Sequence, residues 1–147
     1  MGEGPGYFRP QSTETYFYNG EAVLEGELAP AGWKIPDSDD WQALKEYTKD
    51  SASILKAGEW EVLKEGDTID SGSNLTGFSA YPVGIWGAGK NISQKQLVCY
   101  WTLNETENSI PEQSISFTGS STKFSVAATH VKNETYYKAF SIRCIKE

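Results

Sequence analysis

The sequence predicts an α+β domain in which two short helices pack on a twisted antiparallel sheet. Apolar residues recur at helical spacing in the first half of the chain, whereas β-rich runs separated by turn residues fill the second half. Helices and strands segregated in this way are typical of an antiparallel sheet with helices on one face. A chain of 147 residues, 38% of them hydrophobic, is long enough to bury one core.

The N-terminal segment is expected to lie outside this domain. Residues 1–15 are rich in Gly, Pro and polar side chains, so we interpret them as a flexible tail or an expression remnant, and residues 16–147 as the single domain. The stretch TYFYNGEAV at residues 15–23 then predicts a strand that runs into a turn at Asn19 and Gly20.

The first helix is expected to begin at the acidic stretch PDSDDW, residues 36–41. Asp37 follows a proline, and Asp40 stands three residues later, which is the spacing of an acidic capping box. Asp39 adds a negative charge at the positive end of the helix dipole. The apolar face of this helix is expected to consist of Trp41, Leu44 and Tyr47. The clustered carboxylates therefore predict a helix start, and a metal or acid–base site is the alternative.

A second, shorter helix is expected to begin at Ser51 and to end at Gly58. Residues 61–77 have no periodic pattern and are rich in Gly, Asp and Ser, so they are expected to be irregular. Further strands are predicted in the runs GFSAYPVG at 77–84, LVCYWTL at 97–103, SISF at 114–117, KFSVAATHV at 123–131 and YYKAFSIRCI at 136–145. Four tryptophans are expected in the core, namely Trp33, Trp41, Trp60 and Trp101.

Five blocks, taken in order, resemble those of a known family. They are AGWKIPDSDDW, SILKAGEW, GFSAYPVG, CYWTLNE and FSIRCIKE. The first resembles the GW-h-P-t-d-e-E-W opening of the Fibrobacter succinogenes major paralogous domain, and the last resembles its closing FSVRCVRD. The resemblance covers about residues 16 to 147. Since that family looks related to the formylglycine-generating enzyme group, the resemblance implies a C-type lectin-like domain in an extracytoplasmic bacterial protein, either secreted or anchored at the cell surface.

The resemblance does not bring the enzyme group's catalysis to this chain. That group requires a pair of nearby reactive cysteines, but this chain has two cysteines in all, and Cys144 stands at the structural position of the Arg-Cys block. We therefore expect no enzyme activity and no catalytic residue. Since the resemblance implies an oxidising location, Cys99 and Cys144 are expected either to form a disulfide or to lie close together; the alternative is two buried free thiols.

Nucleotides, metals and nucleic acids are not expected as ligands. The stretch GIWGAGKN at residues 84–91 approaches a phosphate-binding loop, but Asn91 replaces the required Ser or Thr and no helical pattern follows. His130 is the only histidine, and the calcium-binding triplets of lectins are absent, so no metal ligand and no cofactor is predicted. The net charge of -7 without a basic stripe argues against nucleic acid, and no apolar run is long enough for direct membrane insertion.

We expect a non-enzymatic binding or adhesion module that recognises a glycan or a protein. The alternative is a structural or assembly domain of a larger cell-surface protein, without a small ligand. Recognition is expected at loops of the sheet half, residues 84–93, 104–113 and 118–123, because loops on a rigid scaffold commonly carry binding sites. Trp86, flanked by glycine in the first of these loops, would offer a stacking platform unless its indole folds back over the core. The candidate ligand-binding residues are Trp86, Asn104, Glu105, Asn108, Glu112 and Lys123.

Overall fold

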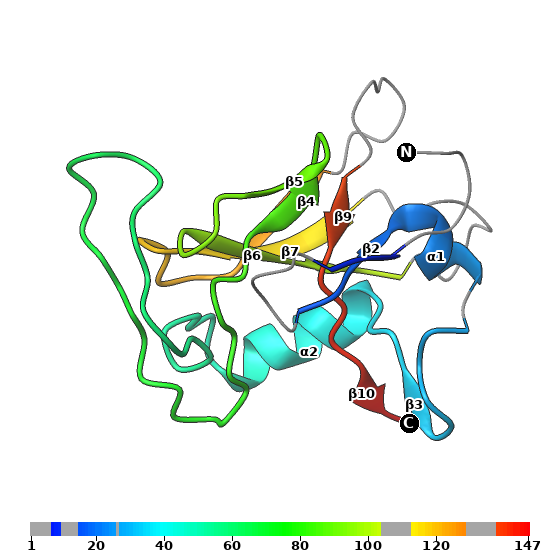
Figure 1. Ribbon diagram of the computed structural model, residues 1–147. Coiled ribbons are helices and arrows are strands. Elements are labelled where there is room, and N and C mark those ends of the chain that lie inside the picture. Colours follow the sequence, from blue (N-terminus) through cyan, green and yellow to red (C-terminus); the bar gives the residue numbers. More distant parts are fainter. Residues whose placement is uncertain (1–6, 10–14, 26, 104–112, 129–137) are drawn as a thin grey trace.

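The described part of the chain contains three antiparallel sheets, two helices and a long segment without either, as the computed structural model in Figure 1 shows. The structure describes residues 7–9, 15–25, 27–103, 113–128 and 138–147. The α+β class, with short helices and mostly antiparallel strands, is therefore confirmed. Neither of the helices in these ranges has the length and apolar character that a bilayer-crossing helix needs.

The largest sheet brings together the two ends of the chain. Its strand order is β1-β2-β9-β4-β5, and all neighbouring strands are antiparallel. The strands are β1 (Tyr7–Phe8), β2 (Phe17–Asn19), β9 (Ala139–Phe140), β4 (Ile85–Gly87) and β5 (Lys90–Ile92). Because Tyr7 pairs with Tyr18 and Phe8 with Phe17, the expected tail of residues 1–15 includes a strand of the sheet. The domain thus begins before residue 16.

A second sheet, with the order β6-β7-β8, packs against the longer helix. Its strands are β6 (Leu97–Trp101), β7 (Gln113–Thr118) and β8 (Ser125–Ala128), and a separate pair is formed by β3 (Trp33–Lys34) and β10 (Ile145–Lys146). The predicted strand at 97–103 is confirmed as β6. The predicted run at 136–145 is divided, in its described part, between β9 and the start of β10.

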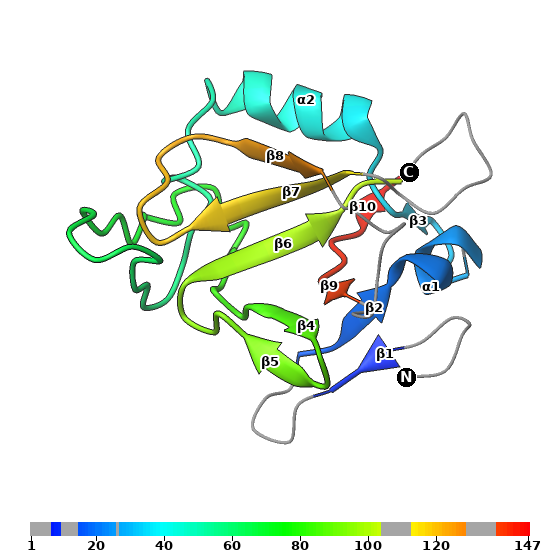
Figure 2. The same ribbon diagram turned by 90° about the horizontal axis from the view of Figure 1, so that it is seen from above.

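The acidic stretch starts a helix, as its spacing predicts. The helix is α2 (Ser38–Tyr47), and Asp37 is its N-cap. The Asp40 backbone N–H donates to Asp37 Oδ1 at 2.8 Å, and the Asp37 N–H donates to Asp40 Oδ2 at 3.0 Å, so the capping box is complete. Trp41 of α2 packs on Tyr100 of β6 with ring centroids 5.7 Å apart, which places the helix on the three-stranded sheet (Figure 2).

Two aromatic residues lie at the surface, although Tyr47 was expected on the apolar face of the helix and Trp33 in the core. Tyr47 is 81% exposed, because it stands in the last turn of α2, where the helix ends. Trp33 is 45% exposed, because β3 has only the short strand β10 as its partner. The other expected core tryptophans are buried, namely Trp41, Trp60 and Trp101.

The second helix is not where the sequence predicts it. Residues 52–55 form only a turn, because the carbonyls of Ser53, Ile54 and Leu55 accept hydrogen bonds from N–H groups outside the segment. The Ala52 N–H donates to the carbonyl of Thr122 at 2.9 Å, and the Ala80 N–H donates to the carbonyl of Leu55 at 2.9 Å. The second helix of the described residues is instead α1 (Gly20–Glu25), at the place where a turn was expected. Its N–H at Ala22 donates to Asn19 Oδ1 at 3.0 Å, which is how an N-cap stabilises a helix start.

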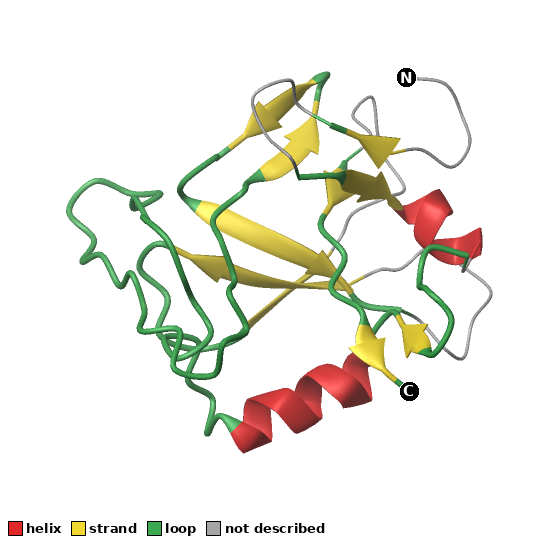
Figure 3. Cartoon of the chain, turned by 60° about the horizontal axis from the view of Figure 1, so that its bottom comes forward, coloured by secondary structure: helices red, strands yellow, loops and turns green. Residues whose placement is uncertain are grey.

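A long segment without helix or strand, residues 48–84, connects α2 to β4 (Figure 3). The irregular structure predicted for residues 61–77 is confirmed, but the strand predicted at 77–84 is wrong, because only isolated bridges form there. The segment is attached to the three-stranded sheet through a buried lysine. Lys56 Nζ donates to the backbone carbonyls of Thr118, at 2.8 Å, and Ser121, at 3.1 Å.

Candidate functional site

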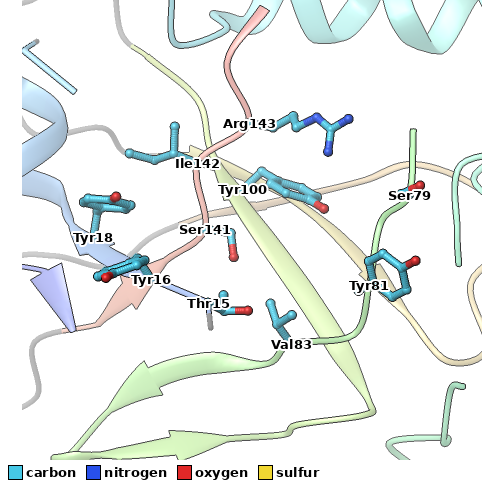
Figure 4. Close-up of a pocket in the computed structure, with 10 residues that line it drawn as sticks. All are labelled: Thr15, Tyr16, Tyr18, Ser79, Tyr81, Val83, Tyr100, Ser141, Ile142 and Arg143. Carbon is cyan, nitrogen blue, oxygen red and sulfur yellow. The ribbon is translucent and has the colours of Figure 1, made fainter. Parts of the chain in front are cut away.

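A pocket of about 290 Å³ lies where four parts of the chain meet (Figure 4). These parts are the start of β2, the end of the irregular segment, β6 and the residues that follow β9. The lining residues are Thr15, Tyr16, Tyr18, Ser79, Tyr81, Val83, Tyr100, Ser141, Ile142 and Arg143. Four of the ten are tyrosines, three carry aliphatic hydroxyls, and Arg143 is the only charged one.

Backbone and side-chain hydrogen bonds fix the walls of this pocket relative to one another. Tyr18 of β2 is paired with Phe140 of β9. The Ser141 N–H donates to the carbonyl of Cys99 at 3.0 Å, and the Trp101 N–H donates to the carbonyl of Ser141 at 3.1 Å. In addition, the indole Nε1–H of Trp101 donates to the carbonyl of Tyr18 at 2.6 Å. These bonds hold β2, β6 and the chain after β9 in one arrangement.

The four tyrosines differ in exposure and therefore in what they can do. Tyr16 and Tyr81 are 42% and 52% exposed, so their rings are accessible to a ligand, whereas Tyr100 is only 6% exposed. Burial raises the pKa of Tyr100 well above its usual value, and the nearby Arg143 cation opposes this shift. Burial also raises the pKa of Tyr18. At neutral pH both of these phenols are therefore uncharged hydroxyl groups that can donate a hydrogen bond.

Arg143 brings a positive charge to the pocket. Its Cζ lies 4.5 Å from the ring centroid of Phe78, which is a cation–π contact. Among the described residues no carboxylate forms an ion pair with Arg143, and no acceptor takes a hydrogen bond from it. Figure 4 shows the Arg143 side chain and the Tyr100 hydroxyl extending toward the same side of the pocket, the side of Ser79 and Tyr81.

Ser141 lines the pocket with a hydroxyl that has no bonding partner. The residue is 7% exposed, and its Oγ is buried without a hydrogen bond to any described residue. A buried hydroxyl without a partner costs about 1–3 kcal/mol, which a ligand oxygen or a water molecule at this position would remove. By contrast, Ser79 Oγ accepts a hydrogen bond from Asn74 Nδ2 at 3.0 Å.

The pocket lining is aromatic and rich in hydroxyl groups. None of its lining residues has a carboxylate, imidazole, amine or thiol, so there is no general base with a pKa near neutrality. No group of three or more metal-ligating His, Cys, Asp or Glu residues occurs in the part of the chain that the structure describes. The available interactions are stacking on tyrosine rings, hydrogen bonds from hydroxyls and attraction by one guanidinium cation.

Trp86 does not lie in a loop, as was expected, but in β4. Residues 84–93 contain a β-hairpin, in which Ala88 and Gly89 form a two-residue turn with φ values of 51° and 74°. Positive φ at both positions is what such a tight turn requires, which explains why the strand continues. The indole of Trp86 stacks on Phe8 with ring centroids 5.7 Å apart, and its buried Nε1 finds no acceptor within the described ranges. One face of this indole is therefore covered by the chain itself.

The other candidate residues do not converge with Trp86 in the described structure. Lys123 is exposed in the connection between β7 and β8 of the other sheet, and neither it nor Trp86 lines the pocket. Outside the described residues lie Asn104, Glu105, Asn108, Glu112 and His130. The pocket was missed because its tyrosines, such as those of TYFY at residues 15–18, occur in patterns that predict only strands. A high local density of tyrosine is the signal that could have indicated it.

Cys99 and Cys144 are free thiols in the structure, so the disulfide proposed from the resemblance is not formed in it. Both belong to one hydrophobic cluster, together with Trp101 and Phe140. Burial raises the pKa of Cys99 to about 12, and it also raises the pKa of Cys144. Both thiols are therefore protonated near neutral pH and pack as small apolar side chains.

One protein family matches almost the whole chain. The family is the Fibrobacter succinogenes major domain, and its model matches residues 7–146. The match begins at β1, in agreement with the pairing of Tyr7 and Phe8 in the largest sheet. No curated protein and no solved structure is significantly similar to the chain.

Proposed function

The chain belongs to the Fibrobacter succinogenes major domain family, and we propose that it is a non-enzymatic binding module that recognises a glycan in the tyrosine-lined pocket. The observation that supports this function is the composition of the pocket, which combines four phenol rings, three aliphatic hydroxyls and one cation without an acid–base group. Aromatic rings stack on the apolar faces of sugar rings, and hydroxyls exchange hydrogen bonds with sugar hydroxyls.

The size of the pocket favours a small ligand. Its volume of about 290 Å³ is at the lower limit of the roughly 300–1,000 Å³ that is typical of small-molecule sites. A stable protein partner would instead cover a surface of about 800 Å². The pocket therefore suits one sugar unit, such as the end of a glycan chain.

A structural domain without a ligand is the second candidate, but it gives no reason for two features of the pocket. These are the buried hydroxyl of Ser141 and the guanidinium of Arg143, which lack polar partners among the described residues. A ligand with several oxygen atoms would give both groups a partner.

The proposal also includes the type of fold and the cellular location of the protein. We propose a C-type lectin-like architecture that is distantly related to the formylglycine-generating enzyme group. It is supported by the position of α2 ahead of the strands β4 to β10 and by the long irregular segment in front of β4. Membership of the family supports a secreted or surface-anchored position in a bacterium, where glycans are accessible.

A glycan array followed by isothermal titration calorimetry tests the proposed function. The wild-type domain is expected to bind at least one class of glycan, and Tyr81→Ala is expected to weaken that binding by at least about 1 kcal/mol. Tyr81 is a suitable position because its ring is half exposed at the pocket. The matched control is Tyr47→Ala, since Tyr47 is 81% exposed on α2 and is not part of the pocket lining.

The same experiment includes Trp86→Ala to compare the two candidate surfaces. If the pocket binds the glycan, this variant loses stability with its contact to Phe8 but keeps the wild-type affinity. If Trp86→Ala loses affinity for the glycan while Tyr81→Ala keeps the wild-type affinity, the binding site lies at the β4–β5 hairpin and not in the pocket. If the domain captures a surface protein in a pull-down but binds no glycan on the array, the proposed ligand class is wrong.

A further inference from the structure

We infer that the glycan bound in this pocket carries a carboxylate group that pairs with the guanidinium of Arg143; this inference rests on the proposed function. Arg143 is the only charged residue among the ten that line the pocket, and none of the ten is acidic. No described residue supplies a counter-charge to it. A cation in such a hollow favours a ligand that brings its own negative charge.

The guanidinium of Arg143 contacts the ring of Phe78 and forms no hydrogen bond with a described residue. The Arg143 Cζ lies 4.5 Å from the ring centroid of Phe78, a cation–π contact that requires no hydrogen bond from the guanidinium group. The N–H donors lie in the plane of the guanidinium group, in a fork that matches the two oxygens of a carboxylate. The contact with Phe78 thus leaves these donors without an acceptor among the described residues.

Two uncharged hydroxyls add to the donors of the same pocket. Tyr100 keeps its proton at neutral pH, and no described residue forms a hydrogen bond with its hydroxyl. Ser141 Oγ is likewise unpaired. A neutral sugar could bond with these hydroxyls but would leave the cation without a counter-charge. An acidic sugar, such as a uronic acid, provides both hydrogen-bonding partners for the hydroxyls and a counter-charge for Arg143.

The negative net charge of the protein does not oppose this ligand strongly. The net charge is -7, but at physiological ionic strength charge interactions are screened beyond about 8 Å. The nearest charge, that of Arg143, therefore dominates the interaction. A single cation also matches a singly charged carboxylate better than a doubly charged phosphate, which is usually bound by several cationic or N–H groups.

Calorimetry with matched pairs of sugars tests this inference. The pairs are galacturonic acid with galactose, glucuronic acid with glucose, and N-acetylneuraminic acid with its methyl ester. The wild-type domain is expected to bind the acid of at least one pair about tenfold or more tighter than the neutral member, which corresponds to one charge-assisted hydrogen bond. Arg143→Gln should bind both members with the affinity that the wild type has for the neutral sugar.

Arg143→Lys is the second variant, because it keeps the charge over Phe78 but lacks the planar fork. It should retain a preference for the acid that is smaller than that of the wild type. Thermal unfolding of both variants shows whether the fold is intact, and Tyr81→Ala should weaken the acid and the neutral sugar equally.

Three outcomes would contradict these proposals in different ways. Equal wild-type affinity for acid and neutral sugars would overturn the carboxylate and leave the glycan-binding function in place. Tighter binding of a sulfated galactose than of galacturonic acid, lost in Arg143→Gln, would replace the carboxylate by a sulfate ester. Failure of the folded domain to bind any acidic or neutral glycan would overturn both the inference and the proposed function.

Discussion

Lys56 lies fully buried with its Nζ 3.6 Å from Asp70 Oδ2, within a segment that has neither helix nor strand. The same Nζ donates to the carbonyls of Thr118 and Ser121 and lies 4.6 Å from the ring centroid of Trp60. Burial lowers the pKa of Lys56, and the carboxylate of Asp70 opposes this shift. The cation therefore fastens residues 48–84 to the end of β7.

Replacing this lysine should destabilise the protein strongly. Lys56→Met leaves Asp70 and two carbonyls without their cation, so the free energy of unfolding should fall by about 3 kcal/mol in urea denaturation. The control is Lys95→Met, which breaks a pair with Glu61 at 3.9 Å in which both side chains are 59% exposed. This control should cost less than about 1 kcal/mol. Equal losses in the two variants would show that Lys56 does not hold the segment in place.

Gly72 is expected to be essential for the approach of the chain to Lys56. It has a φ of +75°, and a Cβ added there would lie 2.6 Å from Lys56 Cβ and 2.6 Å from the Ser53 carbonyl oxygen. Gly66 has a similar φ of +92° but has no atom within 4 Å of such a Cβ. Gly66→Ala should therefore cost about 1–2 kcal/mol for the backbone alone, and Gly72→Ala at least about 1 kcal/mol more for the clash. Thermal or urea unfolding measures the difference between the two variants. Equal destabilisation by Gly72→Ala and Gly66→Ala would show that the chain around Gly72 shifts to make room for the methyl group.

The N-cap of α2 contributes to stability and not to binding. Asp37→Ala should lower the free energy of unfolding by about 1 kcal/mol, because the Asp40 N–H loses its acceptor. Asp37→Asn is the matched control and should be within a few tenths of a kcal/mol of wild type, since asparagine caps equally well. Glycan affinity should be unchanged in both variants. A loss of binding at unchanged stability would instead give these carboxylates a direct role in the site.

The buried thiol of Cys99 should make the protein less stable in alkaline solution. Its pKa is about 12 in the folded state against 9.0 for a free thiol, so the folded state keeps a proton that the unfolded chain releases. The resulting stabilisation is complete below pH 9 and is lost as pH rises toward 12. Between pH 8 and about pH 10, the wild type should lose about 1 kcal/mol more than Cys99→Ala in denaturation at each pH. Parallel pH profiles of the two proteins would mean that the thiol is accessible to water.

Removing the unpaired hydroxyl of Ser141 should lower the affinity for the glycan without lowering the stability of the fold. Ser141→Ala deletes a buried Oγ that has no partner among the described residues, so the free energy of unfolding should stay the same or rise by up to about 1 kcal/mol. If the hydroxyl bonds to the glycan, the affinity should fall several-fold in calorimetry. A variant that is less stable would indicate that the hydroxyl has a structural partner.

The sequence by itself determined the elements that depend on near neighbours. The capping box needs only Asp37 and Asp40, three residues apart, so it could be predicted without any tertiary contact. The apolar run of β6 is likewise a local pattern, and the α+β class follows from the order of such patterns. The ordered blocks along the chain also indicated the family, which the match over residues 7–146 confirms.

The tertiary structure decided whatever depends on residues far apart in the chain. The helix expected after Ser51 is absent because the carbonyls of Ser53, Ile54 and Leu55 accept hydrogen bonds from distant N–H groups, those of Ser73, Thr76 and Ala80, which no local pattern indicates. The pocket likewise combines residues from four separate parts of the chain, which only the pairing of β2, β6 and β9 brings together. A pattern of near neighbours specifies local hydrogen bonds and apolar faces, whereas a cavity is formed by the packing of distant segments, and that packing exists only in the folded chain.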